Sequence, residues 1–351
     1  MKYKLHTYVF LAIFLLILGG KGGAVENNPL EFLWEIDAPR SSVAVGEYSL
    51  PVICNDLLYM EEHGGKNNKL NVYDLKTGNI IGSIDNPAIF NMIGPITNGD
   101  EVIYVNEVTN SITKLNKATP IWQKKYKSKI WEVAIDKKNI YINLTNELVF
   151  LDIDGEVKKS IINNDGSSIL IDDKNIYLLG EYLYKINKNT AEIKYKLNYK
   201  DHGIYYLIRQ NNKYLFGNNG DIILKETGDI VKNIEDKVDM MYFGVSDKYI
   251  VSCEKDKLIV LDAINFNKIL EKKINDYYTF EPIIQDDLLY IFLDRFVIID
   301  LKTGDVLWED KDRDDFIEYI PQIIVTDKYI GIYVEKGEDS VVRIYKSKLE
   351  Y

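Results

Sequence analysis

One short phrase recurs eight times along this 351-residue chain, and it constrains the fold more than any other feature of the sequence. Each copy is a polar turn followed by a short β-type run, as in "NDLLYME", "KKNIYIN" and "DDLLYIF". When the copies are aligned on the turn, one position always holds Leu or Ile, and successive copies lie between 35 (250 − 215) and 45 (103 − 58) residues apart. These positions are Leu58, Ile103, Ile140, Ile176, Leu215, Ile250, Leu289 and Ile330. Such a near-constant period indicates that the chain folds as a series of similar units.

Two further phrases complete each unit. One is an apolar run, a turn rich in Asp, Asn, Thr and Gly, and a second apolar run, as in "LNVYDLKTGNIIGSI" and "FVIIDLKTGDVLWED". This pattern predicts a hairpin, because Asp bonds its own turn backbone and Gly supplies the residue with positive φ. The other is a weaker strand before each first phrase, such as "WEVAI". Each unit is therefore predicted to be a four-stranded antiparallel meander, which is the size and content of a β-propeller blade.

The two ends of the chain decide the number of blades. The eighth copy ends in "SVVRIYKSKLEY" and lacks an outer strand, whereas "LEFLWEID", at Leu30–Asp37, is a strand without a blade. Donating the early strand to the last blade would close the ring and remove an exposed sheet edge. The sequence thus predicts an all-β fold, an eight-bladed β-propeller closed by its N-terminal strand. The alternative of seven blades leaves one repeat unexplained.

The N-terminal segment has the layout of a secretory signal. It has a basic start, an apolar run over Tyr8–Leu18, and small residues that place Gly22 and Ala24 at the −3 and −1 positions of a cleavage site. The apolar run is shorter than the roughly 20 residues of a spanning helix. We interpret residues 1–24 as the signal, with an uncleaved anchor at residues 8–20 as the alternative, and residues 25–351 as one propeller domain. The protein is expected to be exported, either secreted, at the cell surface or in the periplasm.

Charge and residue counts argue against several classes of function. A net charge of −11 repels phosphate backbones, so no nucleic-acid partner is expected. Cys54 and Cys253 form no disulfide framework and match no zinc spacing, which predicts free and mostly buried thiols. His63 and His202 are too few for a histidine metal cluster. The "DIDGE" stretch at Asp152 lacks the distal Glu of a calcium loop and is interpreted as a tight hairpin turn.

One turn motif resembles a known family of repeats. The pattern D-x-x-T-G-x-x-x-W is complete at Asp300, Thr303, Gly304 and Trp308. It is partial at Asp74, Thr77 and Gly78, where Gly82 stands in the place of Trp. This is similar to the pyrroloquinoline-quinone-type propeller repeat, which occurs in quinoprotein dehydrogenases and in exported propellers that bind no quinone. Trp34 and Trp122 resemble the Trp of the outer strand in that repeat.

The resemblance also allows the enzymatic branch of the family to be checked. It implies a calcium ion, an Asp base, a Trp platform and a disulfide between adjacent cysteines. This chain has no adjacent cysteines, and its Trp residues fall mostly in outer-strand positions, with Trp131 on an inner strand as the exception. We therefore expect no pyrroloquinoline quinone, no other cofactor and no catalytic residues.

Acidic loops suggest a binding surface. In a propeller, the loop between the second and third strands of a blade shares a face with the loops that link blades. On that face lie three acidic segments, which become neighbours once the ring closes. Their candidate partner-binding residues are Glu61, Glu62, Asp312, Asp314, Asp315, Glu335, Glu338 and Asp339. Together they could attract a basic partner or a cation, whereas solvated loops of an acidic protein are the alternative interpretation.

These observations lead to one functional hypothesis and one alternative. The hypothesis is an exported, non-catalytic, monomeric propeller that acts as a protein–protein interaction scaffold at the cell envelope. Its partner would be an envelope or extracellular protein, and it would meet the membrane only through an uncleaved N-terminal segment. The alternative is a small-ligand or cation site in the mouth of the central channel, including an enzyme that acts on sugars or lactones.

Overall fold

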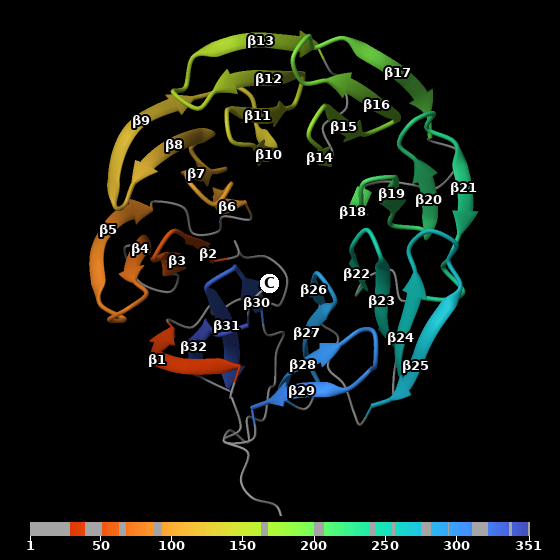
Figure 1. Ribbon diagram of the computed structural model, residues 1–351. Coiled ribbons are helices and arrows are strands. Elements are labelled where there is room, and N and C mark those ends of the chain that lie inside the picture. The colour runs from red at the N-terminus through yellow and green to blue at the C-terminus, as the bar shows by residue number, and fades with distance from the viewer. Residues whose placement is uncertain are drawn as a thin grey trace, which may run out of the picture.

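The computed structural model describes residues 29–38, 51–62, 68–86, 93–162, 168–199, 207–238, 243–254, 257–274, 282–293, 295–310, 322–336 and 339–349. The predicted signal segment, residues 1–24, lies outside these ranges. The described residues form 32 strands arranged as eight separate four-stranded antiparallel sheets, which stand around a common centre (Figure 1). They contain no helix of the length and apolarity that crossing a membrane requires. The prediction of an eight-bladed β-propeller is confirmed, and the seven-bladed alternative is wrong.

The blades are numbered from the sheet that begins with β2, so that β1 belongs to blade 8. The inner strands of blades 1 to 8 are β2 (Val52–Cys54), β6 (Gly94–Thr97), β10 (Ile130–Ile135), β14 (Ile169–Ile171), β18 (Leu207–Gln210), β22 (Phe243–Val245), β26 (Ile283–Gln285) and β30 (Gln322–Val325). The second strands are β3 (Leu57–Glu62), β7 (Val102–Asn106), β11 (Asn139–Leu144), β15 (Asn175–Leu179), β19 (Tyr214–Gly217), β23 (Tyr249–Glu254), β27 (Leu288–Phe292) and β31 (Tyr329–Lys336).

The remaining two strands of each blade form its outer hairpin. The third strands are β4 (Asn68–Asp74), β8 (Ser111–Asn116), β12 (Glu147–Asp152), β16 (Tyr182–Asn187), β20 (Asp221–Leu224), β24 (Lys257–Asp262), β28 (Phe296–Asp300) and β32 (Asp339–Ser347). The outer strands are β5 (Ile80–Asn86), β9 (Thr119–Lys125), β13 (Val157–Ile162), β17 (Ile193–Asn198), β21 (Ile230–Asn233), β25 (Lys268–Lys273), β29 (Val306–Glu309) and, for blade 8, β1 (Leu30–Ala38).

The repeated Leu or Ile position forms the centre of every blade. All eight of these residues lie on the second strand, and each is fully buried. Because successive side chains of a strand point to opposite faces, each of them packs toward one neighbouring blade while its chain neighbours face the other. The position that holds Leu or Ile in all eight copies is thus explained by packing between neighbouring sheets and not by a catalytic or binding role.

The ring is closed by the two ends of the chain. β1 pairs antiparallel with β32, from Leu30 opposite Ser347 to Ala38 opposite Ser340. Figure 1 shows this red strand lying outside the dark blue strands of the last blade. The prediction that the N-terminal strand completes blade 8 is confirmed. A blade made from both ends of the chain prevents the ring from opening at its seam.

The outer strand of one blade docks on the outer turn of the next. Trp34 of blade 8 donates its indole N–H to the carbonyl of Leu75 in blade 1 at 2.7 Å, and its ring lies over Gly78. Trp122 of blade 2 lies in the same way over Gly155 of blade 3. The Trp and the Gly of the repeat therefore meet between successive blades and not within one blade.

Other blades make the same joint with different side chains. Leu270 of blade 6 lies against Gly304, and Leu197 of blade 4 lies against Gly228. Between blades 1 and 2 both partners are small, since Gly82 on the outer strand meets the Cβ of Ala118 on the turn. A large side chain on one partner requires a small residue on the other, so the residues of this joint vary together between successive blades.

Two glycines of similar positive φ allow the effect of this packing to be measured apart from that of backbone strain. Gly99 and Gly155 have φ of 95° and 89°, but an added Cβ meets nothing within 4 Å at Gly99 and lies 2.9 Å from Trp122 at Gly155. Gly99→Ala is expected to lower the unfolding free energy by about 1 kcal/mol through strain alone. Gly155→Ala should cost about 1–3 kcal/mol more, because the indole must move. Chemical denaturation of both variants measures this, and equal losses would contradict the docking role of Trp122.

The seam of the ring contains a second testable contact. Arg343 of β32 is 2% exposed, and its Nε donates to the Glu35 carboxylate of β1 at 2.6 Å. Glu35→Ala should lower the unfolding free energy by about 2 kcal/mol, because it removes a carboxylate from a buried guanidinium. The matched control is Glu31→Ala on the same strand, where an exposed pair with Lys348 spans 3.8 Å and is worth about 0.5 kcal/mol or less. Equal effects of the two variants would show that Glu35 does not secure the seam.

Candidate functional site

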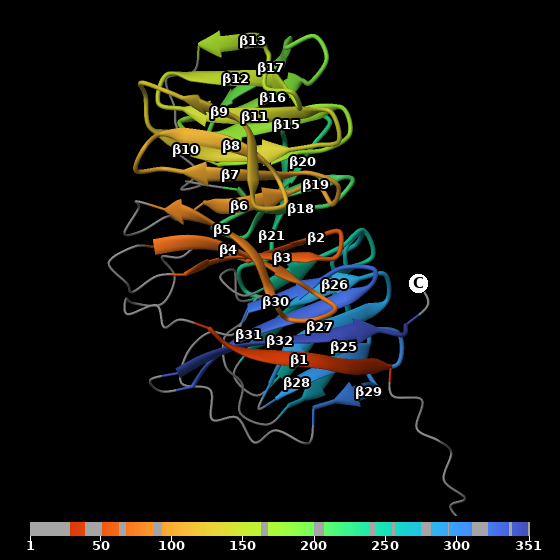
Figure 2. The same cartoon turned by 90° about the vertical axis from the view of Figure 1, so that its left-hand side faces the viewer.

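The propeller has two unlike faces. The turns between first and second strands and the turns between third and fourth strands lie on one face, which we call the turn face. The loops between second and third strands and the linkers between blades lie on the opposite face, which we call the loop face. Figure 2 shows the ring of blades edge-on, so that the two faces lie on opposite sides of the molecule.

In seven blades the end of the third strand, which begins the outer turn in every blade but blade 8, is tied to the inner turn by one backbone hydrogen bond. A residue at the end of the third strand donates its N–H to a carbonyl of the inner turn at 2.8–3.0 Å. The donor and acceptor pairs are Leu75 and Asp56, Ile153 and Lys138, Lys188 and Lys174, Lys225 and Lys213, Ala263 and Lys248, Leu301 and Asp287, and Ser347 and Lys328. This bond, which we call the turn tie, holds the two turns of a blade together.

The donor of the turn tie also fills the space beside the preceding blade. Leu75 is fully buried in this position. In blades 4 and 5 the position holds Lys188 and Lys225, whose ammonium groups reach Asp136 (2.5 Å) and Asp172 (3.5 Å) of the preceding blade. Both lysine side chains are almost fully buried. The space between blades is therefore filled whether the residue is apolar or charged.

Blade 2 is the exception among the blades. Its outer turn has only two residues, Lys117 and Ala118, between the paired Asn116 and Thr119, whereas blade 1 has the four residues 75–78 between Asp74 and Asn79, which share a backbone hydrogen bond. Asn116 pairs directly with Thr119 across the short turn, and Lys117 takes a positive φ of 53°. Within the fully described turns of blade 2, no amide makes a turn tie to the inner turn.

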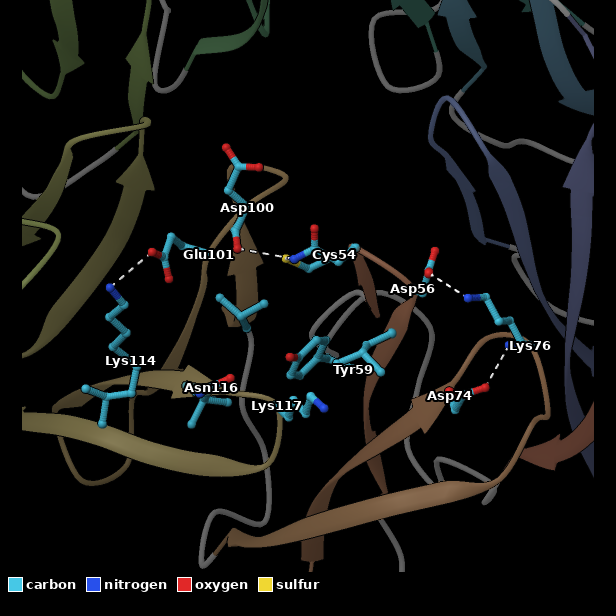
Figure 3. A pocket seen from close by; sticks show the side chains of 15 residues that line it. Cys54, Asp56, Tyr59, Asp74, Lys76, Asp100, Glu101, Lys114, Asn116 and Lys117 are labelled. Carbon is cyan, nitrogen blue, oxygen red and sulfur yellow. Dashed lines mark hydrogen bonds and ion pairs between the residues drawn. The ribbon is translucent and has the colours of Figure 1, made fainter.

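The shortened turn leaves a cleft of about 560 Å³ between blades 1 and 2 on the turn face (Figure 3). Its polar walls come from the inner and outer turns of both blades. They are formed by Asn55, Asp56, Asp74, Lys76, Asp100, Glu101, Asn116 and Lys117. The cleft lies where a residue equivalent to Leu75 would stand in blade 2, so its cause is a deletion in one hairpin turn.

Most charges of the cleft are compensated within it. Lys76 pairs with Asp56 and Lys114 pairs with Glu101, each at 3.2 Å. The Asp74 carboxylate accepts two amides of its own turn at 2.9 and 3.0 Å. Four carboxylates and three lysines line the cleft, so it attracts neither simple cations nor simple anions strongly.

The back of the cleft is chemically inert. The Cys54 thiol donates to the carbonyl of Gly99 at 3.4 Å, and burial raises its pKa. Burial also raises the pKa of Tyr59 to about 12. Both groups therefore keep their protons at neutral pH, and a protonated thiol is a poor nucleophile and metal ligand. The wall behind the polar turns acts as packing and not as catalytic machinery.

A half-buried acid lies in the wall of the central channel. Glu132 of β10 accepts the backbone N–H of Ile169 on β14 at 2.5 Å, which links the inner strands of blades 3 and 4. Burial raises the pKa of Glu132 to about 7. Beside it, Trp131 is exposed, with the Lys129 ammonium 3.9 Å from its ring centre. The sequence analysis placed Trp131 on an inner strand, which is confirmed, but it did not single out Glu132.

The predicted acidic surface falls on the loop face and is only partly described. Glu61 and Glu62 end strand β3 and do not lie in a loop. Glu61 is buried, and the Glu62 carboxylate accepts from Asn71 at 2.8 Å, so neither offers a free acidic surface. Asp312, Asp314, Asp315 and Glu338 lie outside the described residues, and only the backbones of Glu335 and Asp339 are described, at the facing ends of β31 and β32. Convergence of these segments stays a prediction.

Other candidate sites of the sequence have structural explanations. Among the described residues, no group of three or more His, Cys, Asp or Glu side chains is arranged to hold a metal ion. Asp152 accepts the amide of Glu156 at 2.7 Å and pairs with Lys158, which confirms a hairpin turn. Cys54 and Cys253 are free and buried, as predicted. His63 and His202 lie outside the described residues.

Comparison with known proteins shows the fold but no family. No protein-family model matches the chain, and no protein with a curated description matches it. Among solved structures, Sqt1 from Saccharomyces cerevisiae is similar, with 12% identity, a TM-score of 0.62, and coverage of 90% of this chain and 99% of that one.

Two further solved structures come from other groups of propellers. The quinohemoprotein alcohol dehydrogenase from Comamonas testosteroni is 10% identical, with a TM-score of 0.61 and coverage of 94% of this chain and 78% of that one. The Pan2 WD40 domain from Neurospora crassa is 11% identical, with a TM-score of 0.54 and coverage of 92% and 96%. Likeness at such identities extends to architecture only, and it includes a quinohemoprotein dehydrogenase, in agreement with the resemblance of the repeat.

The pKa of Glu132 predicts a pH-dependent effect of one substitution. Because the folded pKa (about 7) is above the ordinary value of 4.5, the folded state binds the extra proton between these pH values, and stability falls as pH rises through that window. Glu132→Gln cannot titrate but can still accept the Ile169 amide. Its unfolding free energy relative to the native protein should therefore rise by about 1–3 kcal/mol between pH 4 and pH 8. Thermal melts at both pH values measure this difference, and a constant difference would contradict the assignment.

Proposed function

We propose that the protein is an exported scaffold of the cell envelope that binds another protein. The observation that carries the proposal is a girdle of exposed aliphatic and aromatic side chains around the rim. Every outer strand contributes at least one such residue, at 44–85% exposure. The girdle comprises Phe32, Ile80, Ile81, Ile121, Val157, Ile162, Ile193, Val231, Ile269, Val306 and Leu307.

The position of these side chains in the blades supports a binding role. Most of them follow the outer turn directly, where seven outer strands carry a β-bulge and β1 carries one opposite β32. Bulges redirect side chains and end regular pairing, which blunts an outer edge against unspecific strand addition. Single exposed aliphatics are ordinary on protein surfaces, but their recurrence at the same place in each blade gives the rim a regular series of apolar contacts suited to a protein partner.

Export and the envelope location rest on the N-terminal sequence. The basic start, short apolar run and small residues before position 25 have the layout of a secretory signal. A rigid disc without its own catalytic constellation among the described residues suits a scaffold, and a monomer with a closed ring leaves its whole rim available.

Site-specific photo-crosslinking in intact native cells tests this proposal. A photoreactive residue at Val231, Ile269 or Leu307 should capture one and the same envelope protein, because the three positions lie on the outer strands of the successive blades 5, 6 and 7. Lys273, exposed at the far end of β25, is the matched control position and should capture less of it. Ile269→Asp should reduce capture from Leu307 severalfold, since it places a charge among the exposed apolar residues. Equal capture at Lys273, or no common partner, would refute the proposal.

The alternative function, a small-ligand site, gains one observation of its own. The described cleft between blades 1 and 2 is a formed cavity with converging polar groups, which is the usual form of a ligand site. It lies between two blades and not in the mouth of the central channel, where the sequence analysis placed such a site.

A further inference from the structure

We infer that the cleft between blades 1 and 2 is a binding site for a neutral saccharide. This inference does not depend on the proposed protein partner, because the cleft is on the turn face and the partner is assigned to the rim; Ile121 of blade 2 alone belongs to both. It rests on three features: a cavity made by one shortened turn, internally compensated charges, and unused hydrogen-bonding groups on the wall formed by blade 2.

The shortened turn is the first argument for a function. Seven blades keep the turn tie, and donors such as Leu75 and Leu301 are fully buried against the preceding blade. Blade 2 alone gives up both and leaves a cleft of about 560 Å³, which is within the size range of small-molecule sites. Empty space between packed sheets lowers stability, so a deletion that creates it is expected where the space is used.

The charges of the cleft narrow the class of ligand. A cation would meet Lys76, Lys114 and Lys117, and an anion would meet four carboxylates. Two of those carboxylates are already paired with lysines at 3.2 Å. The cleft therefore favours a ligand without net charge that exchanges hydrogen bonds with both kinds of group.

Three side chains supply the unused hydrogen-bonding groups. Asp100, Asn116 and Lys117 are exposed at the cleft and make no side-chain hydrogen bond or ion pair to any described residue. The Asp100 carboxylate is an acceptor, the Lys117 ammonium is a donor, and the Asn116 amide is both. A hydroxyl donates and accepts at the same time, so vicinal hydroxyls of a sugar can bond to all three.

The apolar parts of the cleft favour a saccharide over a peptide. Tyr59, Val102 and Leu115 are at most 3% exposed, so no pocket exists there for the apolar anchor side chain that peptide binding relies on. The walls are hairpin turns and not an open strand edge, which excludes strand addition. Ile121, at 55% exposure, offers one flat apolar contact at the rim of the cleft, which suits the C–H face of a sugar ring.

A turn graft tests the inference directly. Replacing the Lys117–Ala118 turn with the Leu-Lys-Thr-Gly sequence of the blade 1 turn adds two residues and fills the cleft. A panel of neutral trisaccharides, built from hexoses, pentoses or N-acetylhexosamines, is titrated against the native chain and the graft. At least one should bind the native chain with a dissociation constant of about 1 mM or lower, and the graft should weaken it at least tenfold.

Point variants test the same site without the change in chain length that could prevent the graft from folding. Asn116→Ala and Lys117→Ala should each weaken the same trisaccharide about threefold to tenfold, since each removes one hydrogen bond. Lys125→Ala removes the same charge from the far end of β9 and should leave the affinity unchanged. The inference is overturned if no neutral trisaccharide binds, if binding survives the graft, or if only charged saccharides or peptides compete for the cleft. Loss of saccharide binding with intact crosslinking at the rim would separate this site from the proposed scaffold function.

Discussion

The whole ring depends on one joint, the docking of an outer strand onto the outer turn of the following blade. Each blade of a propeller contacts only its two neighbours, so stability is built from the blades and the interfaces between them. In blade 8 the outer strand is β1, whose Trp34 makes this joint with Leu75 and Gly78 of blade 1. The first strand of the chain therefore both completes the last blade and locks it to the first.

The same joint explains the imperfect repeat. What must be kept is a close fit between the two partners, because interiors are closely packed and respond to single methylene groups. Trp122 on Gly155 and Leu270 on Gly304 achieve it with a large side chain over a glycine, whereas Gly82 against Ala118, beside the cleft, achieves it with two small residues. A motif that describes one repeat alone misses it, since the two partners belong to successive repeats.

Much of the architecture follows from the sequence because it depends on local patterns. The fully buried position represented by Leu58 and Ile330, the hairpin turns and the unpaired early strand are all visible as periodicity and turn chemistry. Burial of Glu61 could not be predicted, because an acid at the end of a strand looks the same whether the next loop covers it or not. Glu132 was missed for a related reason: its environment is formed by the neighbouring blade.

The cleft was not predicted, although the shorter outer turn of blade 2 that causes it is visible in the sequence. "KLNKATPIW" has two residues fewer in its turn than "VYDLKTGNIIG", a difference that resembles ordinary variation between copies. Only the structure shows that those residues carry the turn tie and fill the space between blades. A single deletion can thus convert a structural interface into a site while the rest of the ring stays closed.

The unfolding free energy of the turn-graft protein tests this account most directly. If the missing residues are the cause of the cleft, the graft buries one leucine and forms an eighth turn tie to the carbonyl of Glu101, which lies two residues before Ile103 as the other acceptors lie before their Leu or Ile. It should then raise the unfolding free energy by about 1–3 kcal/mol. An unchanged or lower value would show that blades 1 and 2 cannot accept the longer turn, and that the cleft is a fixed feature of their packing rather than the result of a deletion.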